Sequence, residues 1–154
     1  MTILGSCTRH WPDEAACAAS AQALAASPAL EGAYVELHGP LGAGKTTFVR
    51  HLLRALGVAG RIKSPTYALL EPYDTPRGPV AHFDFYRFDD PQEWEDAGLR
   101  DVFAGPGLKL AEWPEKARAL LPPADLRVHI EPQDDESRRV TFTAQSARGL
   151  ELLP

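Results

Sequence analysis

Ala33 to Gly57 reads AYVELHGPLGAGKTTFVRHLLRALG, which places an apolar segment, a glycine-rich segment and an amphipathic segment in direct succession. The first segment, AYVELHG, has the β-branched and aromatic content of a strand. The third segment carries apolar residues at helical spacing and then a glycine that would stop a helix: Phe48, Val49, Leu52, Leu53, Leu56 and Gly57. The order of the three segments predicts a strand, a tight loop and a helix.

The middle segment matches the phosphate-binding pattern G-x-x-x-x-G-K-[ST], with Gly39, Pro40, Leu41, Gly42, Ala43, Gly44, Lys45 and Thr46. Glycines let a backbone wrap a triphosphate closely and point consecutive N–H groups at it. The N-terminus of the following helix adds the positive end of its dipole. From this pattern we expect Lys45 to bridge the β- and γ-phosphates of a nucleotide and the Thr46 hydroxyl to bind Mg²⁺.

Further strand and helix patterns on both sides predict an α/β fold. We expect a single P-loop NTPase domain over residues 1–154, with a mixed central sheet, flanking helices and a C-terminal antiparallel hairpin. The expected helices cover 13–26, 45–56, 90–98 and 114–121. The expected strands cover 33–39, 66–73, 80–88, 107–112, 125–132 and 138–144. Residues 145–154 are expected to be a loose tail.

Composition excludes several classes of protein. The chain has 154 residues and a net charge of −5, and an acidic domain is a poor binder of nucleic acid on its own. Cys7 and Cys17 provide neither a disulfide framework nor a zinc motif. Because the chain shows no long apolar run and no signal-peptide pattern, we expect a cytoplasmic protein that does not enter a membrane.

Two carboxylates follow apolar strand patterns further along the chain. Asp84, in VAHFDFYRF, could hold Mg²⁺ directly or through water, or orient an attacking water molecule. The alternative is a polar residue on a half-exposed strand. Glu112, in LAEWPE, could reach the same ion, or it could be an exposed charge at a strand end. Trp113 beside it is typical of packing.

Several other polar residues have a functional and a structural interpretation. Ser64, Pro65 and Thr66 could form a switch loop that senses a γ-phosphate, or a plain turn. His82 could shuttle protons, or it could be a hydrogen-bonded strand histidine. Arg87 could pair with phosphate or with Asp84, or it could form a surface ion pair. The cations after the loop are either a solvated face or a docking patch: Arg50, His51, Arg54, Arg61 and Lys63.

The pattern from the residues alone leaves three functions open: an ATPase, a small-molecule P-loop kinase and a nucleotide-gated binding module. A kinase usually has an arginine-bearing lid. Between Gly98 and Pro123 the chain has only Arg100 and Arg118, which is sparse for a lid. A binding module without hydrolysis would not require Asp84 and Glu112.

From about Gly32 to Glu115 the chain resembles the TsaE (YjeE) family. The resemblance is carried by four motifs in fixed order: GPLGAGKTT, SPTY, HFDFYR and LAEWPE. That resemblance implies a subunit that binds ATP and Mg²⁺, hydrolyses ATP slowly and acts with the proteins TsaB and TsaD. Their shared product is N6-threonylcarbamoyladenosine at position 37 of tRNAs that read ANN codons. It implies contact with tRNA only through the complex.

The resemblance also implies roles for individual residues. The phosphate loop extends to Thr47, Thr46 and Glu112 bind Mg²⁺, and Asp84 is required for activity as a water-positioning or outer-sphere group. Ser64 to Thr66 behave as a switch, and Trp113 matters for activity. Relatives often carry a threonine near the nucleotide base where Cys17 stands here, and Ser137 or Arg138 of the terminal hairpin are further candidates for a nucleotide contact.

Overall fold

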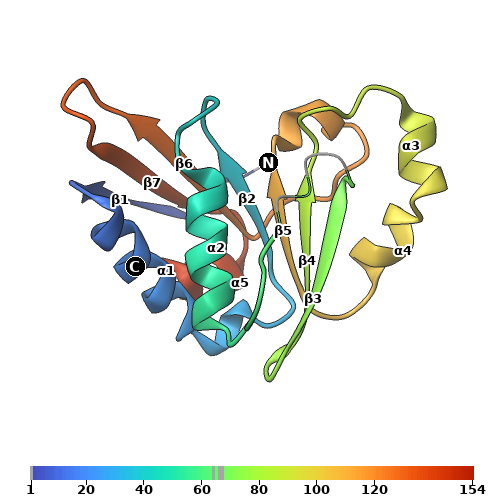
Figure 1. The fold of residues 1–154 in the computed structure, drawn as a ribbon, viewed down its shortest axis with the longest axis horizontal. Helices are drawn as coiled ribbons and strands as arrows, with labels where there is room; N and C mark the ends of the chain where they lie inside the picture. Colours follow the sequence, from blue (N-terminus) through green and yellow to red (C-terminus); the bar gives the residue numbers. More distant parts are fainter. Residues whose placement is uncertain (1, 64, 66–67) are drawn as a thin grey trace.

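The computed structural model describes residues 2–63, 65 and 68–154. Within these residues, strands form a seven-stranded sheet in the order β1-β7-β6-β2-β5-β4-β3 (Figure 1). Strands β6, β2, β5 and β4 run parallel to one another, and β1, β7 and β3 pair antiparallel with their neighbours. The strands are β1 (Gly5–Trp11), β2 (Tyr34–His38), β3 (Leu70–Thr75), β4 (Gly78–Asp84), β5 (Leu108–Glu112), β6 (Leu126–Pro132) and β7 (Arg138–Ala144).

Helices lie on both faces of this sheet (Figure 1). On one face α1 (Glu14–Ala25) and α2 (Lys45–Ala55) pack against each other, with the 3₁₀ turn η1 (Pro28–Leu30) and α5 (Ala147–Leu152) nearby. The short helices α3 (Pro91–Asp96) and α4 (Leu99–Ala104) lie on the other side of the molecule beside β3 and β4, and η2 (Pro114–Ala117) follows β5. Among the described residues, no helix has both the length and the apolar character needed to cross a membrane.

The core has two parts, one on each face of the sheet. Val35 and Leu37 of β2 pack with the apolar stripe of α2, including Phe48 and Leu52. Tyr34, the first residue of β2, faces the other way and joins the aromatic cluster under α3 and α4. Because β2 and β5 are covered on both faces, they are buried along nearly their whole length, as central parallel strands usually are.

The α/β class, the mixed sheet with flanking helices and the C-terminal hairpin agree with the sequence prediction. The Asp13 carboxylate caps α1 by accepting a hydrogen bond from the Ala16 amide at 3.0 Å. Pro91 stands in the first turn of α3, after the capping residue Asp90. Strands β6 and β7 pair antiparallel as predicted, from Leu126 with Ala144 to Pro132 with Arg138.

Other boundaries differ from the prediction. The strand expected at 66–73 is β3 at 70–75, with residues 66–67 outside the described part. The strand expected at 80–88 ends at Asp84, after which the Phe85 amide bonds to the Glu112 carbonyl at 3.0 Å and the chain turns. The helix expected at 114–121 is a single 3₁₀ turn that follows a left-handed residue, Trp113 at φ 54°.

Strand β1 and helix α4 were not predicted at all. Strand β1 pairs with β7, and its side chains before Trp11 are mostly exposed. Its sequence therefore shows no alternation of apolar and polar residues from which a strand could be predicted. Its formation therefore depends on backbone pairing with β7 rather than on a local pattern. Helix α4 begins after Gly98, whose φ is 64°, where the sequence suggested only the end of the preceding helix.

The loose tail expected at 145–154 is wrong, because residues 147–152 form helix α5. The Ser146 hydroxyl caps it by accepting from the Gly149 amide at 3.0 Å, and itself donates to the Asp125 carboxylate at 2.7 Å. Leu152 is 4% exposed and packs into the core with α1 and α2. Tertiary packing thus orders a segment too short to form a stable helix alone.

Candidate functional site

The glycine-rich loop joins the buried end of β2 to the first turn of α2. Gly39, Gly42 and Gly44 have φ values of 149°, 80° and 110°, a region that favours glycine. A Cβ on Gly39 would lie 2.6 Å from the Ile130 carbonyl oxygen, so the loop lies directly on the end of β6. At Gly42 and Gly44 a Cβ would meet no described atom within 4 Å, so this side of the loop is open.

Lys45 is the first residue of α2, yet it is only 5% exposed. Its ammonium group donates a hydrogen bond to the Gly39 carbonyl and lies 3.5 Å from the centroid of the Trp113 ring. Burial lowers its pKa, against the opposing effect of the carboxylates of Glu112, Glu115 and Asp84. The ammonium therefore lies folded over the loop, within a set of nearby carboxylates.

Thr46, Glu112 and His82 form a continuous hydrogen-bonded chain beside the loop. The Thr46 hydroxyl donates to Oε1 of Glu112 at 2.8 Å. The other oxygen, Oε2, lies 2.6 Å from Nε2 of His82. The Glu112 and His82 side chains are 3% and 1% exposed, which excludes the interpretation of Glu112 as an exposed strand-end charge.

Asp84 stands next to Glu112 because strands β4 and β5 run parallel with these two residues in register. Its Oδ1 accepts a hydrogen bond from the Tyr86 amide at 2.9 Å, and the residue is 5% exposed. The interpretation of Asp84 as a residue on a half-exposed strand is therefore wrong. Phe83 and Phe85 pack on the opposite side of the strand, so β4 is covered on both faces.

A cavity of about 180 Å³ collects most of the predicted site residues. It is bordered by the loop, by the ends of β4 and β5 and by Trp113, whose ring centroid is 5.0 Å from that of Tyr86. The residues that line it are Leu41, Gly42, Ala43, Lys45, Thr46, Asp84, Tyr86, Glu112 and Trp113. Of these, sequence reasoning did not single out Tyr86, which had only the signal of standing two residues after Asp84.

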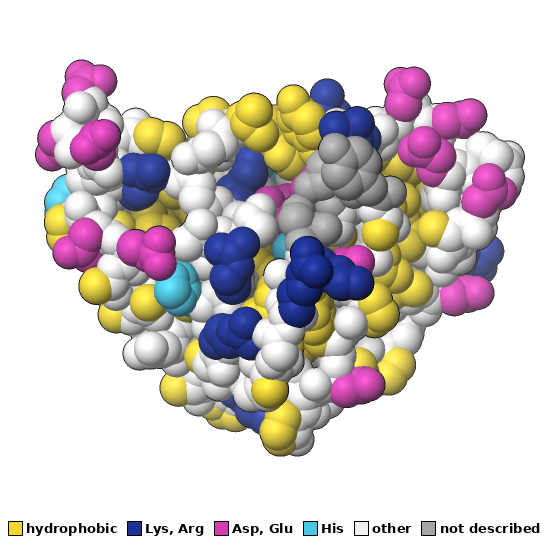
Figure 2. Space-filling model, viewed as in Figure 1, with side chains coloured by type: hydrophobic (Ala, Val, Ile, Leu, Met, Phe, Trp, Pro, Cys, Tyr) yellow, Lys and Arg dark blue, Asp and Glu magenta, His cyan; other side chains and the backbone are white. Residues whose placement is uncertain are grey.

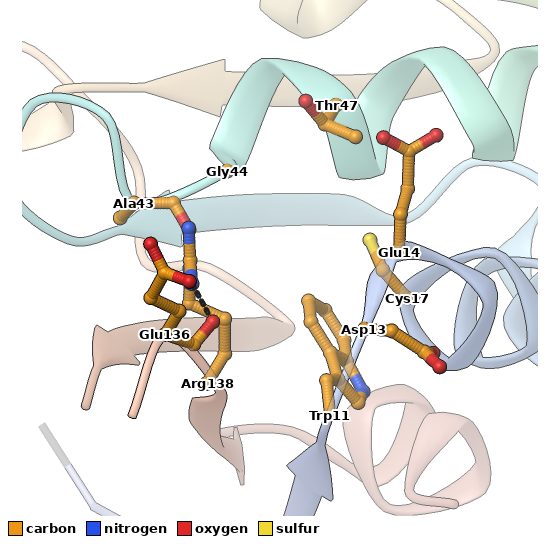
Figure 3. A pocket seen from close by; sticks show the side chains of 9 residues that line it. All are labelled: Trp11, Asp13, Glu14, Cys17, Ala43, Gly44, Thr47, Glu136 and Arg138. Atoms are coloured by element: carbon orange, nitrogen blue, oxygen red, sulfur yellow. Dashed lines mark hydrogen bonds between the residues drawn. The ribbon is translucent and has the colours of Figure 1, made fainter. Parts of the chain in front are cut away.

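A second cavity, of about 210 Å³, lies on the other side of the loop (Figure 3). Ala43 borders both cavities, so the loop separates them. The Trp11 ring stacks on Phe48 at 5.5 Å between centroids, and its face forms part of an apolar wall. The lining residues are Trp11, Asp13, Glu14, Cys17, Ala43, Gly44, Thr47, Glu136 and Arg138. Trp11, Asp13, Glu14 and Glu136 carry no motif, so the sequence did not reveal them.

Of the three further residues that the family resemblance offered for a nucleotide contact, two line this second cavity and one does not. Cys17 lines it, and burial raises the pKa of its thiol to about 12. Arg138 lines it and donates from Nε to the Ala43 carbonyl at 2.8 Å, which ties β7 to the loop. Ser137 is buried in the β6–β7 turn, where its hydroxyl bonds to Asp135 at 2.5 Å, and it does not border this cavity.

The remaining candidates lie elsewhere. Ser64 and Thr66 are outside the described residues, and the described Pro65 is buried, with its carbonyl accepting from the Leu69 amide at 2.8 Å. Arg87 borders a neighbouring cavity that also reaches Asp84. His51 pairs with Glu14 at 3.2 Å. The other four cations after the loop are exposed: Arg50, Arg54, Arg61 and Lys63. Figure 2 shows lysine and arginine side chains gathered near the middle of the face that it displays.

A third buried carboxylate, Glu36 on β2, lies outside both cavities. It accepts from the Tyr34 hydroxyl at 2.7 Å and from both terminal nitrogens of Arg118 at 3.0 Å, and His38 lies 3.0 Å away. Burial alone would raise its pKa, but hydrogen bonds from His38, Arg118 and Tyr34 outweigh burial and lower it to about 2. Arg118 is thus engaged in the fold rather than available for a phosphate lid.

Thr46 and Glu112 are the residues of this site that fit a cation bound together with phosphate. Among the described residues, no group of three or more His, Cys, Asp or Glu side chains could hold a metal ion. Mg²⁺ typically takes one or two protein ligands together with phosphates and water. Thr46 and Glu112, already 2.8 Å apart at the loop, fit that arrangement.

Comparison with known proteins identifies the family of the chain. The family model described as threonylcarbamoyl adenosine biosynthesis protein TsaE matches residues 11–140. The tRNA threonylcarbamoyladenosine biosynthesis protein TsaE of Haemophilus influenzae is 44% identical over 119 residues, which are 77% of this chain and 75% of that protein. The protein of the same name from Bacillus subtilis is 37% identical over 137 residues, 89% of this chain and 84% of the relative.

The fold has a solved counterpart as well. The crystal structure of Bacillus subtilis YdiB superimposes with a TM-score of 0.79 and 28% identity, covering 99% of this chain and 94% of that one. The family match includes the glycine-rich loop, both site carboxylates and Trp113, and extends into the terminal hairpin. On this evidence the chain belongs to the TsaE family of threonylcarbamoyl adenosine biosynthesis proteins.

Proposed function

We propose that the protein is the Mg²⁺-dependent, ATP-binding and ATP-hydrolysing subunit of the machinery that makes N6-threonylcarbamoyladenosine at position 37 of tRNAs reading ANN codons. The observation that carries the proposal is the Thr46–Glu112 contact next to Lys45, at the open side of the glycine-rich loop. Loop amides, one ammonium group and a hydroxyl–carboxylate pair are what a triphosphate with its cation needs. The cytoplasm is the proposed location.

The two cavities suggest how the nucleotide lies. The phosphates would lie across the loop toward Lys45 and Thr46, in the cavity of about 180 Å³. The base would then enter the cavity of about 210 Å³, against Trp11 and Cys17. Lys45 would release the Gly39 carbonyl and the Trp113 face and turn its charge to the phosphates.

For hydrolysis the chain would supply residues that bind the cation and the phosphates and a carboxylate that orients the attacking water. Mg²⁺, when bound, neutralises charge on the phosphates. Thr46 and Glu112 would hold it, while Lys45 and the loop amides stabilise charge on the leaving group. The carboxylate of Asp84, in register with Glu112 on the neighbouring strand, would orient the attacking water.

The partners in this proposal are TsaB and TsaD, and contact with tRNA comes only through their complex. Among the described residues that line the phosphate cavity there is no arginine. An arginine supplied by a partner can accelerate phosphoryl transfer about 10³–10⁵-fold. We therefore expect slow hydrolysis by the isolated chain and faster hydrolysis in the complex.

The proposal is tested by calorimetry with Mg-ATP and by phosphate release, each with and without the TsaB–TsaD pair. Wild-type protein should bind Mg-ATP, and Lys45→Ala should lose most of that affinity. Competition with GTP measures the base preference. Absence of Mg-ATP binding, or equal turnover with and without the partners, would contradict the proposal.

The small-molecule kinase is less compatible with the fold. Arg118 is one of two arginines in the segment where a lid would lie. Both of its terminal nitrogens donate hydrogen bonds to the buried Glu36 carboxylate. Phosphoryl transfer from ATP to a nucleoside or nucleotide, rather than to water, would restore that alternative.

A further inference from the structure

We propose that His82 is a positioning residue for the metal site: its imidazole holds the Glu112 carboxylate in the orientation that presents Oε1 to Thr46 and to a nucleotide-bound divalent cation. The inference rests on the proposed function, since it concerns the same site. It assigns a role to a histidine that does not line the cavity bordered by Lys45 and Asp84.

The geometry of the carboxylate is the first argument. Oε2 of Glu112 lies 2.6 Å from Nε2 of His82, and Oε1 lies 2.8 Å from the Thr46 hydroxyl. The two contacts pin the two oxygens on opposite sides, so the carboxylate plane cannot rotate without losing one of them. An imidazole N–H on one oxygen fixes which oxygen faces the cation, as outer ligands do at many metal sites.

The burial of the pair is the second argument. The side chains of His82 and Glu112 are 1% and 3% exposed, and Nδ1 of His82 has no hydrogen-bond partner within the described part of the chain. A buried polar pair with an unsatisfied atom is weak as a device for stability, since apolar side chains of similar volume would serve as well. Among the described residues the hydrogen-bond partner of the His82 ring is Glu112. We therefore infer that the role of His82 is to hold Glu112.

Glu36 shows how this fold treats a buried carboxylate that has only a structural task. Its oxygens are engaged by Tyr34, His38 and Arg118, with Arg127 at 3.5 Å, and it borders neither cavity. Glu112 has Thr46 and His82 as its hydrogen-bond partners and lies at the cavity wall. Its arrangement leaves Oε1 able to accept a further positive partner.

The test compares the wild-type protein with three variants. It measures Mn²⁺ binding to their ADP complexes by electron paramagnetic resonance, and their affinity for ADP in EDTA. His82→Leu removes the donor at similar volume, and His82→Gln retains an N–H donor of similar reach. We expect His82→Leu to weaken Mn²⁺ binding about tenfold or more, with ADP affinity in EDTA unchanged and with partial recovery in His82→Gln. Tyr34→Phe, which removes one hydrogen bond from Glu36, is the matched control and should leave Mn²⁺ affinity unchanged.

Unchanged Mn²⁺ affinity in His82→Leu would overturn the inference while leaving the proposed function intact. Equal loss of ADP affinity with and without metal, in both His82 variants, would also overturn it, because His82 would then only support packing. Failure of the wild-type protein to bind ADP and Mn²⁺ would overturn the proposed function and this inference together.

A measurement without substitution of His82 guards against a variant that does not fold. In ¹⁵N–¹H spectra of the wild-type protein, the Nε2 proton of His82 should appear as a slowly exchanging, downfield signal. The signal should shift on addition of the diamagnetic Mg²⁺–ADP complex, compared with addition of ADP alone. It should be lost in Glu112→Gln. A signal insensitive to both changes would overturn the inference.

Discussion

Lys45 and Thr46 each bond to a partner within the chain at the place where the proposed nucleotide complex would bind. The Lys45 ammonium lies on the Gly39 carbonyl and the Trp113 ring, and the Thr46 hydroxyl lies on Glu112. Buried polar groups need such partners, because an unpaired one costs roughly 1–3 kcal/mol. If the proposed function holds, ligand binding at this site exchanges these partners for the ligand, and the affinity for the ligand depends on how strongly the internal partners bind.

Gly39 and Gly42 offer a matched pair of substitutions in the loop. Gly39→Ala should lower the free energy of unfolding by roughly 2 kcal/mol or more, because a left-handed backbone costs about 1–2 kcal/mol and the new Cβ would overlap the Ile130 carbonyl oxygen at 2.6 Å. Gly42→Ala meets no described atom and should cost only the backbone part. Urea denaturation measures both, and equal losses would contradict the steric argument.

Cys17 should be chemically quiet although it lines a cavity. Its pKa is raised to about 12 by burial, so at pH 8 only about one thiol in 10⁴ is the reactive thiolate. Iodoacetamide followed by mass spectrometry should modify the half-buried Cys7 well before Cys17. Modification of both at the same rate would show that the second cavity is open to solvent to a greater extent than the fold implies.

At the scale of elements, the ends of parallel strands bring the site together. Strands β2, β5 and β4 end at one edge of the sheet, and the glycine-rich loop, Glu112 and Asp84 follow these ends. Ligand sites of open α/β sheets lie at this edge because the chain leaves the strands there on both faces. Separations in sequence of tens of residues become hydrogen-bond distances only through this pairing.

The terminal helix α5 provides a prediction at this scale. Leu152→Ala should lower the free energy of unfolding by about 2–3 kcal/mol, since Leu152 is 4% exposed in the main core cluster. Leu150→Ala is the control in the same helix and should cost much less, because Leu150 is 43% exposed. Equal, small effects measured by denaturation would mean that the segment is the loose tail that its sequence suggests.

At the scale of the whole molecule, the Glu36 network joins distant parts of the chain. It ties β2 to Arg127 on β6 and to Arg118 after η2, across the sheet face opposite α2. The folded-state pKa of Glu36, about 2, is below the ordinary glutamate pKa of 4.5. A depressed carboxylate pKa stabilises the fold above the unfolded value and loses that contribution as pH falls through the folded value.

Acid stability therefore depends on Glu36 within a defined window. At pH 7 Glu36→Gln should be less stable than wild type by about 3 kcal/mol, the scale of a buried ion pair with one partner removed. That difference should shrink as pH falls from about 4.5 to about 2, where wild-type Glu36 becomes protonated. Chemical denaturation of both proteins across this range measures it, and a constant difference would exclude Glu36 as the titrating group.

Much of this architecture could be predicted from local sequence. The strand–loop–helix segment from Ala33 to Gly57 was predictable because its apolar periodicities and glycines are local signals. The hairpin of β6 and β7 was predictable for the same reason. Strand β1, helix α5 and the second cavity were not, because Trp11, Leu152 and Glu136 acquire their environments from residues more than a hundred positions away or across the sheet.

The amino-acid sequence by itself determined the position of the glycine-rich loop and the alternation of strands and helices. The physical reason is that the backbone freedom of glycine and the spacing of apolar side chains act over a few neighbouring residues. Tertiary structure alone decided that Glu112 bonds to both Thr46 and His82, that Asp84 and Glu112 share a register and that Arg118 binds Glu36. These contacts depend on the order and direction of strands, which are set by packing of the whole sheet and leave no trace in local periodicity.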